Sequence, residues 1–290
     1  MAVKTVQYIF NGQTYNLTYN STSGKYEATV TAPGKSSYGQ TDHVLGGTVK
    51  ATDVAGNTAT VDQSHATLGA SLKIRVKEKV APVISITEPT TGSYITTETP
   101  AIKFKVTDAD SGVNAGTIAL KIDGTAATGI TKTAVTGGYE CSYTPSTALS
   151  DGAHTISVTA SDNDGNASAA KTATFTIDTV PPTLSVTAPV DNLVTNKNTV
   201  TITGKTDDIT SKPVTVTVNG TAVTVATDGT FSKDVTLVNG SNTITIVAKD
   251  KAGKTTTATR KVTLDTAAPV IKSITLTPNP VDCGKTFVIA

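Results

Sequence analysis

Apolar and polar residues alternate over much of the chain, in short segments that are separated by Gly, Asn, Asp and Pro. Val214–Val218 and Asn242–Ala248 are examples. A period of two predicts β-strands, and the Thr and Val that dominate these segments have branched side chains that suit a pleated surface. No segment spaces its apolar residues as an amphipathic helix would for long enough to predict one. The pattern therefore predicts an all-β protein.

One hairpin sequence occurs three times: a strand that runs into Asp-x-x-Gly, at Asp53–Gly56, Asp162–Gly165 and Asp250–Gly253. After each copy come a Thr/Ala-rich strand and a Pro-containing junction, namely Val80-Ala-Pro82, Val180-Pro-Pro182 and Ala267-Ala-Pro269. Such a repeat predicts tandem domains, and Pro makes each junction short and stiff because it fixes φ. We therefore expect immunoglobulin-like (fibronectin III-like) β-sandwiches in an elongated rod.

The expected domains are module 1 over residues 1–79, module 2 over 80–179, module 3 over 180–266, and a tail over 267–290. Module 3 has the clearest pattern, because Asn219-Gly220, Asp228-Gly229 and Asn239-Gly240 supply the positive φ that tight hairpins need. Its alternating strands match the plan of an immunoglobulin-like sandwich.

Module 1 departs from this plan. Residues 3–33 align with 214–240, so module 1 lacks the two opening strands, whereas residues 267–290 resemble the openings of modules 2 and 3. Three explanations stay open. The segment Val61–Leu72 patches module 1 while the tail begins a fourth module; or the tail pairs with the open edge of a neighbouring copy; or another protein covers that edge.

Composition excludes several classes of function. A net charge of +1 provides no electrostatic footprint for nucleic acid, and no apolar run is long enough for membrane insertion. The first residues, Met1–Phe10, form no basic region followed by an apolar run, so no export signal is expected there. No nucleophile elbow, phosphate loop or zinc motif is present, so we expect no catalytic residues, no organic cofactor and no enzymatic activity.

Two cysteines and one histidine are expected to be structural. Cys141 and Cys283 lie in different modules, which favours free thiols. Cys141 alternates with Tyr139 and Tyr143 along a strand, and we expect it to be a small buried side chain. His154 occupies the place of Asn242 in module 3, which predicts a polar residue at the start of a strand.

Four carboxylates form the one candidate metal site of the sequence: Asp108, Asp110, Asp162 and Asp164. Their two loops are expected at the same end of module 2, where they could hold Ca²⁺, a cation that prefers six to eight oxygen ligands. The alternative is structural, because Asp-x-x-Gly is a common turn in which Asp bonds its own backbone.

Aromatic residues concentrate near the N-terminus. The candidates for partner binding are Tyr8, Phe10, Tyr15, Tyr19 and Tyr26. They belong either to a core that faces inward or to a surface that docks a protein or stacks on sugars.

The junction Val80–Pro89 and the sequence Val106–Val113 resemble bacterial Ig-like domains. More narrowly, Asn11–Thr18, Gly24–Pro33 and Ala66–Lys79 resemble leaderless Ig-like proteins of clostridial phage and prophage tail regions. That resemblance implies a virion component that is released by lysis, with other virion or tail proteins, copies of itself, or a bacterial surface glycan as partners. The alternatives are a fragment of a secreted Gram-positive adhesin or stalk, which would be extracellular, and an accessory region of a carbohydrate-active enzyme.

Overall fold

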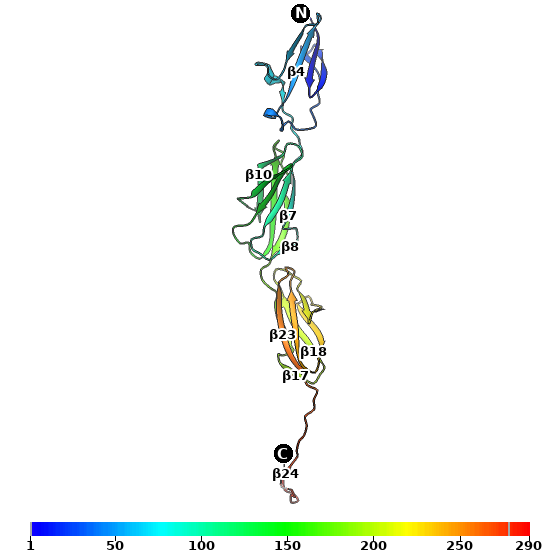
Figure 1. The fold of residues 1–290 in the computed structure, drawn as a ribbon, viewed down its shortest axis with the longest axis vertical. Coiled ribbons are helices and arrows are strands. Elements are labelled where there is room, and N and C mark those ends of the chain that lie inside the picture. The colour runs from blue at the N-terminus through cyan, green and yellow to red at the C-terminus, as the bar shows by residue number, and fades with distance from the viewer. Residues whose placement is uncertain (1, 278) are drawn as a thin grey trace. The chain divides into compact units, whose positions relative to one another are not determined.

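The computed structural model describes residues 2–277 and 279–290, and it divides the chain into two compact units, Met1–Asp178 and Thr179–Ala290 (Figure 1). Apart from the 3₁₀ turns η1 (Thr41–His43) and η2 (Gly69–Leu72), the regular elements of the described residues are all β-strands. No helix in this part of the chain has the length and apolarity to cross a membrane. The predicted all-β class is confirmed.

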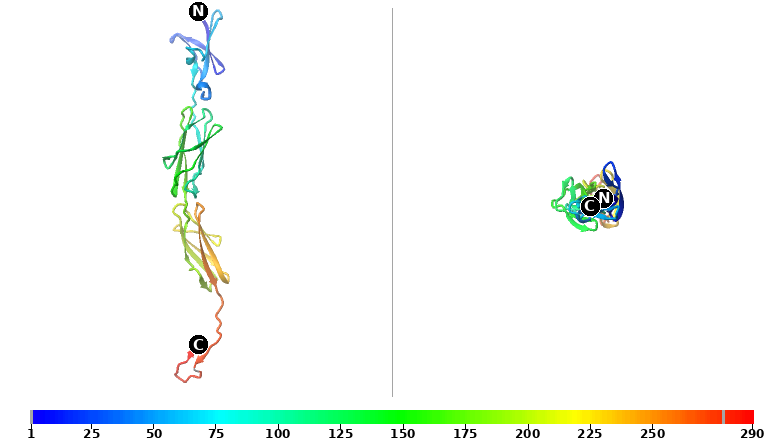
Figure 2. Two further views of the ribbon diagram at one scale, coloured as in Figure 1. Left: turned by 60° about the vertical axis from the view of Figure 1, so that its left-hand side comes forward. Right: turned by 90° about the horizontal axis from the view of Figure 1, so that it is seen from above.

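Module 2, in the first unit, consists of two sheets, which lie in two layers in Figures 1 and 2. The larger sheet has the strand order β11-β10-β14-β15-β8 and the smaller one β12-β13-β9-β7. The strands are β7 (Val83–Glu88), β8 (Ser93–Ile95), β9 (Ile102–Thr107), β10 (Val113–Ile122), β11 (Thr125–Ala126), β12 (Thr131–Val135), β13 (Gly138–Tyr143), β14 (Gly152–Asp162) and β15 (Lys171–Ile177).

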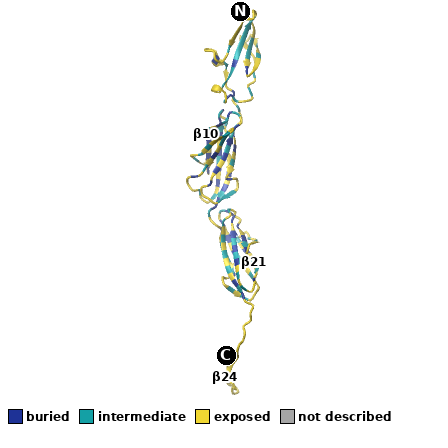
Figure 3. Ribbon diagram, in the orientation of Figure 1, coloured by how far each residue is buried: buried dark blue, intermediate teal, exposed yellow. Residues whose placement is uncertain are grey.

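Alternation along these strands produces the core of module 2. In β9, Ile102, Phe104 and Val106 are buried, while the lysines between them point outward. They pack with Leu120 and Val158 of the facing sheet in one continuous cluster. Cys141 belongs to this cluster, as predicted, and Cys283 is exposed; both thiols are free. Buried residues of modules 2 and 3 line the strands in Figure 3.

Module 3, in the second unit, repeats this architecture with the sheets β17-β23-β22-β19-β20 and β16-β18-β21. Its core includes Ile202, Val216, Ile244 and Val262. The predicted turn at Asn219-Gly220 is confirmed, because both residues have positive φ. The strands are β16 (Thr183–Ala188), β17 (Leu193–Thr195), β18 (Thr199–Asp207), β19 (Thr215–Val218), β20 (Thr221–Val223), β21 (Thr230–Thr236), β22 (Gly240–Lys249) and β23 (Thr255–Leu264).

Module 1 forms a single sheet with the order β3-β2-β1-β4-β5, to which β6 adds by pairing with β4. Within the described residues, neither hydrophobic core cluster includes a residue of module 1. The segment Val61–Leu72, which was expected to patch the module, ends in η2, and β6 follows it. The strands are β1 (Val3–Phe10), β2 (Gln13–Asn20), β3 (Lys25–Glu27), β4 (Leu45–Asp53), β5 (Thr58–Val61) and β6 (Lys73–Ile74).

The strand register of module 1 shows which face of its sheet corresponds to the buried face of the larger sheet in module 2. Tyr8 lies opposite Val49 and Phe10 opposite Gly47, as Leu120 lies opposite Val158 and Ile122 opposite Ile156 in module 2. In module 2 these positions are buried between the two sheets. In module 1, Tyr8 and Val49 are only half-buried. Module 1 thus has the inner face of a sandwich without the complete second layer.

The tail contains a small hairpin, β24 (Leu276–Thr277) paired with β25 (Val288–Ile289). The hairpin is short: residues 271–274 form no strand, and Thr275 exchanges two backbone hydrogen bonds with Ala290, at 2.9 and 3.1 Å. Every described residue of 267–290 is exposed (Figure 3).

Candidate functional site

The repeated Asp-x-x-Gly sequence forms the same turn in all three modules. Oδ1 of Asp53, Asp162 and Asp250 accepts a hydrogen bond from the backbone N–H four residues later, at 2.8, 2.7 and 2.8 Å. The glycine of each motif has a positive φ, which L side chains rarely adopt. The structural role predicted for the motif is therefore present in every copy.

A carboxylate cluster, consisting of Glu78, Asp108 and Asp162, lies at the end of module 2 that adjoins module 1. Each residue contributes one carboxylate oxygen to a group whose members are all within 4.8 Å of one another. Asp108 and Asp162 come from the two predicted loops, and Glu78 comes from the segment before Pro82. In the described part of the chain, no lysine, arginine or histidine forms an ion pair with any of the three.

Backbone groups orient the carboxylate cluster. Asp108 Oδ1 accepts hydrogen bonds from the N–H groups of Asp110, at 3.0 Å, and Gly112, at 2.8 Å. Glu78 Oε1 accepts one from the Ser111 N–H at 2.7 Å. Ser111 is 5% exposed, and its Oγ is buried without a hydrogen-bond partner among the described residues. Backbone N–H groups thus hold Asp108 and Glu78 in place, and one of these donors belongs to Ser111, whose hydroxyl has no partner among the described residues.

The donor set fits a hard divalent cation such as Ca²⁺, which prefers oxygen ligands. Asp108 and Asp162 are 9% and 1% exposed, and two buried carboxylates this close to a third repel one another unless a positive charge lies between them. Each carboxylate oxygen has two lone pairs, so the backbone hydrogen bonds leave acceptor capacity for a cation.

The other two predicted ligands, Asp110 and Asp164, point to module 1 instead. Asp110 Oδ2 accepts a hydrogen bond from the Ser36 N–H at 2.7 Å. Asp164 Oδ2 accepts the Ser36 hydroxyl and the Glu78 N–H, the latter at 3.1 Å, and Arg75 lies 3.7 Å from its other oxygen. The structure therefore separates the four predicted carboxylates into two pairs with different partners.

These contacts form a junction network between modules 1 and 2 within the first unit. Its members are Ser36, Arg75, Lys77, Glu78, Asp110, Asp164 and Asn166. The Asp164 side chain is fully buried there. Burial raises the pKa of Asp164, but the Ser36 hydroxyl, the Glu78 N–H and the positive charges of Arg75 and Lys77 lower it more, and the net pKa lies below its usual value. Asp164 is therefore ionised and fastens the two modules at neutral pH.

Module 3 carries carboxylates in the corresponding loops. Asp208 Oδ1 accepts hydrogen bonds from the Thr210 and Ser211 N–H groups at 2.8 and 2.6 Å. One of its oxygens lies within 4.8 Å of an oxygen of Asp250. Oδ2 of Asp250 is buried without a hydrogen-bond partner among the described residues. The two loops therefore bring carboxylates together in module 3 as they do in module 2.

The five aromatic candidates all lie on the inner face of the module 1 sheet. Tyr8 pairs with Tyr15, and Tyr19 pairs with Tyr26, so their side chains share one side. Phe10 is 3% exposed and stacks on Tyr8, which leaves it no surface for a partner. Tyr19 is 56% exposed and contacts Tyr26. The sequence analysis offered an inward-facing core and an exposed docking surface as alternatives. In the structure these side chains share the inner face, and some of them, such as Tyr19, are nevertheless exposed.

Family comparisons agree with this architecture. The model for the bacterial Ig-like domain matches residues 86–179, and the model for glucodextranase, domain B, matches residues 182–266. This chain is a tandem immunoglobulin-like protein. Bacillopeptidase F of Bacillus subtilis (strain 168) is 32% identical over 194 residues, which is 67% of this chain and 13% of that protein. The tandem immunoglobulin-like protein therefore spans a small part of the curated relative it matches.

Two solved structures illustrate the similarity of this chain to proteins of known structure. The fibronectin(III)-like modules of Clostridium thermocellum CbhA match 63% of this chain and 94% of theirs, with 19% identity and a TM-score of 0.40. The titin domains I67–I69 match 91% of this chain and 88% of theirs, with 12% identity and a TM-score of 0.41.

The sequence did not predict that Glu78, Ser36 or Arg75 contribute to the carboxylate cluster or the junction network. A signal for Glu78 was present, because an acidic residue stands two positions before Val-x-Pro at Glu78 and again at Asp178. Ser36 and Arg75 have no such signal. They lie in irregular or short segments of module 1, and only the folded chain brings them to the loops of module 2.

Proposed function

We propose that this protein is a non-enzymatic structural or adhesive component whose immunoglobulin-like modules hold a contact surface away from the point of anchorage. The observation that carries the proposal is the junction network, in which a fully buried, ionised Asp164 joins modules 1 and 2. Side chains of both modules contribute to this joint. Such contacts restrict the movement of one module relative to the next, as a protein that holds a contact surface at a distance requires.

The experiment is a comparison of backbone ¹⁵N relaxation in modules 1 and 2 of the whole chain. We expect the two modules to have the same rotational correlation time, and Asp164→Ala to shorten the correlation time of module 1. Asp151→Ala, on an exposed loop of module 2 away from the junction network, is the control. Modules that tumble independently in the unmodified chain would contradict the proposal.

The side chains best suited to chemistry support a non-enzymatic role. Burial raises the pKa of the Cys141 thiol in spite of the positive charge of Lys132, and a protonated thiol is a poor nucleophile. His154 is held between Asp123 Oδ2 and the Ser150 carbonyl oxygen, at 2.7 and 2.8 Å, so both ring nitrogens are engaged.

Within this class we propose a virion or phage-like tail component that assists attachment to the bacterial surface. The resemblance of Asn11–Thr18, Gly24–Pro33 and Ala66–Lys79 to phage tail-region proteins supports it. Many copies on one particle would strengthen weak contacts with a surface glycan or protein through avidity. Mass spectrometry of purified particles tests the location: the chain is expected among virion proteins, and its presence only in the cell-wall fraction would favour an extracellular adhesin or stalk.

We propose in addition that the carboxylate cluster binds Ca²⁺. Two observations support this site: Glu78, Asp108 and Asp162 converge without an ion-pair partner among the described residues, and Ser111, whose N–H bonds Glu78, has a buried hydroxyl without a hydrogen-bond partner there. A bound cation would neutralise the mutual repulsion of the carboxylates at the end of module 2 where Glu78 enters. Calorimetric titration with CaCl₂ is the direct test.

A second candidate function is that of an accessory region within a longer enzyme. The match of residues 182–266 to glucodextranase domain B and the 13% span of Bacillopeptidase F favour it. The sequence of the intact gene discriminates the two, since a catalytic domain in the same polypeptide would establish the accessory role and tail genes on either side would favour the virion component.

A further inference from the structure

The strand beside β4 in module 1 is interrupted, whereas its counterparts in modules 2 and 3 are continuous. β15 pairs with β14 from Lys171 to Ile177 without a register shift, and β23 pairs with β22 in the same way. In module 1 the strand is divided into β5 and β6, because residues 62–72 leave the sheet between them. We call residues 62–72 the insert. Segments that leave a rigid scaffold in this way are frequent carriers of binding residues.

Hydrogen bonds within the insert give it a defined shape. The N–H of His65 donates to the Asp62 carbonyl oxygen at 3.2 Å, and the N–H of Gly69 donates to the His65 carbonyl oxygen at 2.9 Å. Asp62 Oδ1 also accepts the N–H and the hydroxyl of Ser64, at 2.8 and 2.6 Å. Gly69 is buried so close to the backbone of Gln63 that a Cβ would lie 2.4 Å from the Gln63 carbonyl oxygen. The insert is therefore a compact series of turns that fixes the backbone at Gln63.

The insert places the carboxamide of Gln63 over Gly46, near the start of β4. A Cβ at Gly46 would lie 1.7 Å from Gln63 Oε1, so this arrangement requires glycine. By the register of β1 with β4, Gly46 takes the place of Thr155 in module 2, which has a side chain. Lys73 lies directly opposite Gly46 in the pairing of β6 with β4. Gln63 and Lys73 thus flank the same glycine.

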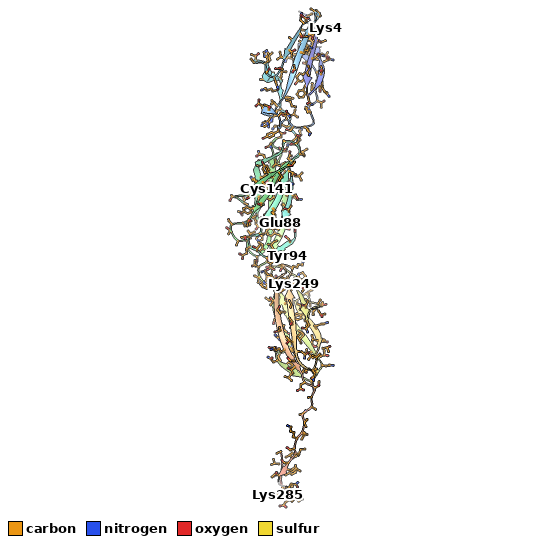
Figure 4. All side chains as sticks on the ribbon, in the orientation of Figure 1. Lys4, Glu88, Tyr94, Cys141, Lys249 and Lys285 are labelled. Atoms are coloured by element: carbon orange, nitrogen blue, oxygen red, sulfur yellow. The ribbon has the colours of Figure 1, made fainter. Side chains whose placement is uncertain are left out.

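These residues line a depression of about 340 Å³ in module 1, which we call the polar pocket. Lys73 Nζ lies 3.9 Å from Asp42 Oδ2, so one positive and one negative charge balance each other there. The polar pocket lies at the end of the sheet opposite Lys4, which Figure 4 labels, because β1 and β4 are antiparallel. The lining residues that come from the η1 turn and its neighbours are Gln40, Thr41, Asp42, Val44 and Leu45.

The polar groups of the pocket have unused hydrogen-bonding capacity. The exposed carboxamides of Gln40 and Gln63 form no hydrogen bond with the described residues, and each offers two donor hydrogens and an acceptor oxygen. Such groups match the neighbouring hydroxyls of a sugar ring, since each hydroxyl both donates and accepts a hydrogen bond. Val44 and Leu45 are half-buried and provide an apolar wall for the C–H groups of the ring. Because the charges of the pocket balance, a neutral ligand suits it better than an ion.

We propose that the polar pocket binds a neutral saccharide unit of a bacterial surface glycan. The inference rests on the proposed adhesive function and assigns the contact to a site in module 1. The carboxamides of Gln40 and Gln63 bond the sugar hydroxyls, and the pocket has the volume of small-molecule sites, which is about 300–1,000 Å³. One small pocket binds a single sugar weakly, and many copies on one particle make the attachment firm.

The first test is a ¹⁵N NMR titration of the whole chain with N-acetylglucosamine, glucose, galactose and rhamnose. Glycerol, which has hydroxyls but no ring, is the control. At least one sugar should shift the side-chain NH₂ signals of Gln40 and Gln63 and the amide signal of Gly46, with a dissociation constant in the millimolar range. No shift with any of these sugars, or equal shifts with glycerol, overturns the inference. The relaxation experiment on the joint between modules 1 and 2 tests the proposed structural role independently of this result.

The second test locates the binding with variants. Gln63→Ala removes an exposed carboxamide and should weaken sugar binding at least about tenfold. Gly46→Ala keeps every polar group of the pocket, but its Cβ displaces the Gln63 carboxamide, so it should weaken binding as much while the circular dichroism spectrum stays unchanged. Gln13→Ala, at an exposed glutamine that does not line the pocket, should bind like the unmodified chain. Full sugar binding by Gln63→Ala overturns the assignment to this pocket.

Discussion

His154 in module 2 and Asn242 in module 3 hold the same position with different chemistry. Asn242 Nδ2 donates to the Val238 carbonyl oxygen at 2.8 Å, and its Oδ1 accepts the Val238 N–H at 2.9 Å. The nitrogens of His154 face two acceptors, Asp123 Oδ2 and the Ser150 carbonyl oxygen. Burial lowers the pKa of His154, but these hydrogen bonds and the Asp123 charge raise it more, and the net pKa lies above its usual value.

This difference predicts that the free energy of unfolding depends on pH in module 2 through His154, which has no counterpart at Asn242 of module 3. Since the folded pKa of His154 exceeds the unfolded value of about 6.5, its stabilisation is complete below that pH and is lost as the pH rises through the folded pKa. The free energy of unfolding of module 2 should therefore decrease above pH ~6.5. His154→Asn should abolish that decrease in urea denaturation across pH, whereas His65→Asn, at an exposed position, should keep it.

Calcium binding is a second prediction about single residues. Asp162 and Asp53 form the same turn, with an asparagine Nδ2 donating to Oδ2 at 2.6 and 2.9 Å, but only Asp162 has other carboxylates beside it. In calorimetry with CaCl₂, Asp162→Asn should weaken binding at least about tenfold, while Asp53→Asn should bind like the unmodified chain. An unmodified chain that produces no heat would show that the cluster holds no calcium.

Strands and turns differ in how far the sequence reveals them. Alternation and the Asn-Gly and Asp-Gly turns identify β9, β10, β19 and β22, because burial on one face requires a period of two. The parallel edge strands β8 and β17 were not predicted, since three residues show no period and their partners β15 and β23 lie far away in sequence. Asp110 and Asp164 were predicted to share one site with Asp108, but they bond Ser36 instead. The sequence indicated that the two loops lie close together, and it did not indicate where each side chain points.

The sheets of modules 1 and 2 should respond differently to truncation of equivalent side chains. Leu120→Ala in β10 removes a fully buried side chain and should reduce the free energy of unfolding of module 2 by about 2–5 kcal/mol. Tyr8→Ala at the equivalent position of β1 should cost module 1 only about 1 kcal/mol, because its ring is half-exposed. Hydrogen exchange of the β10 and β1 amides measures both, and equal losses would contradict the difference in packing.

For the whole molecule, the difference in hydrophobic core between module 1 and modules 2 and 3 predicts that the modules differ in their resistance to proteolysis. Modules 2 and 3 each have a continuous hydrophobic cluster, and among the described residues module 1 contributes to neither. Local opening is therefore easiest in module 1. Apart from cuts in the exposed tail 267–290, the first cuts under limiting protease should fall within residues 1–79, as identified by mass spectrometry of the fragments. First cuts within residues 83–177 or 183–264 would contradict this order.

Glu78 belongs to both functional features of the first unit. Its side chain forms part of the carboxylate cluster, and its N–H donates to Asp164 in the junction network. By thermodynamic reciprocity, an ion that binds more tightly when this joint is closed must also close the joint more firmly. If the carboxylate cluster binds Ca²⁺ as proposed, the joint between modules 1 and 2 would be looser in calcium-poor surroundings and stiffer in calcium-rich ones.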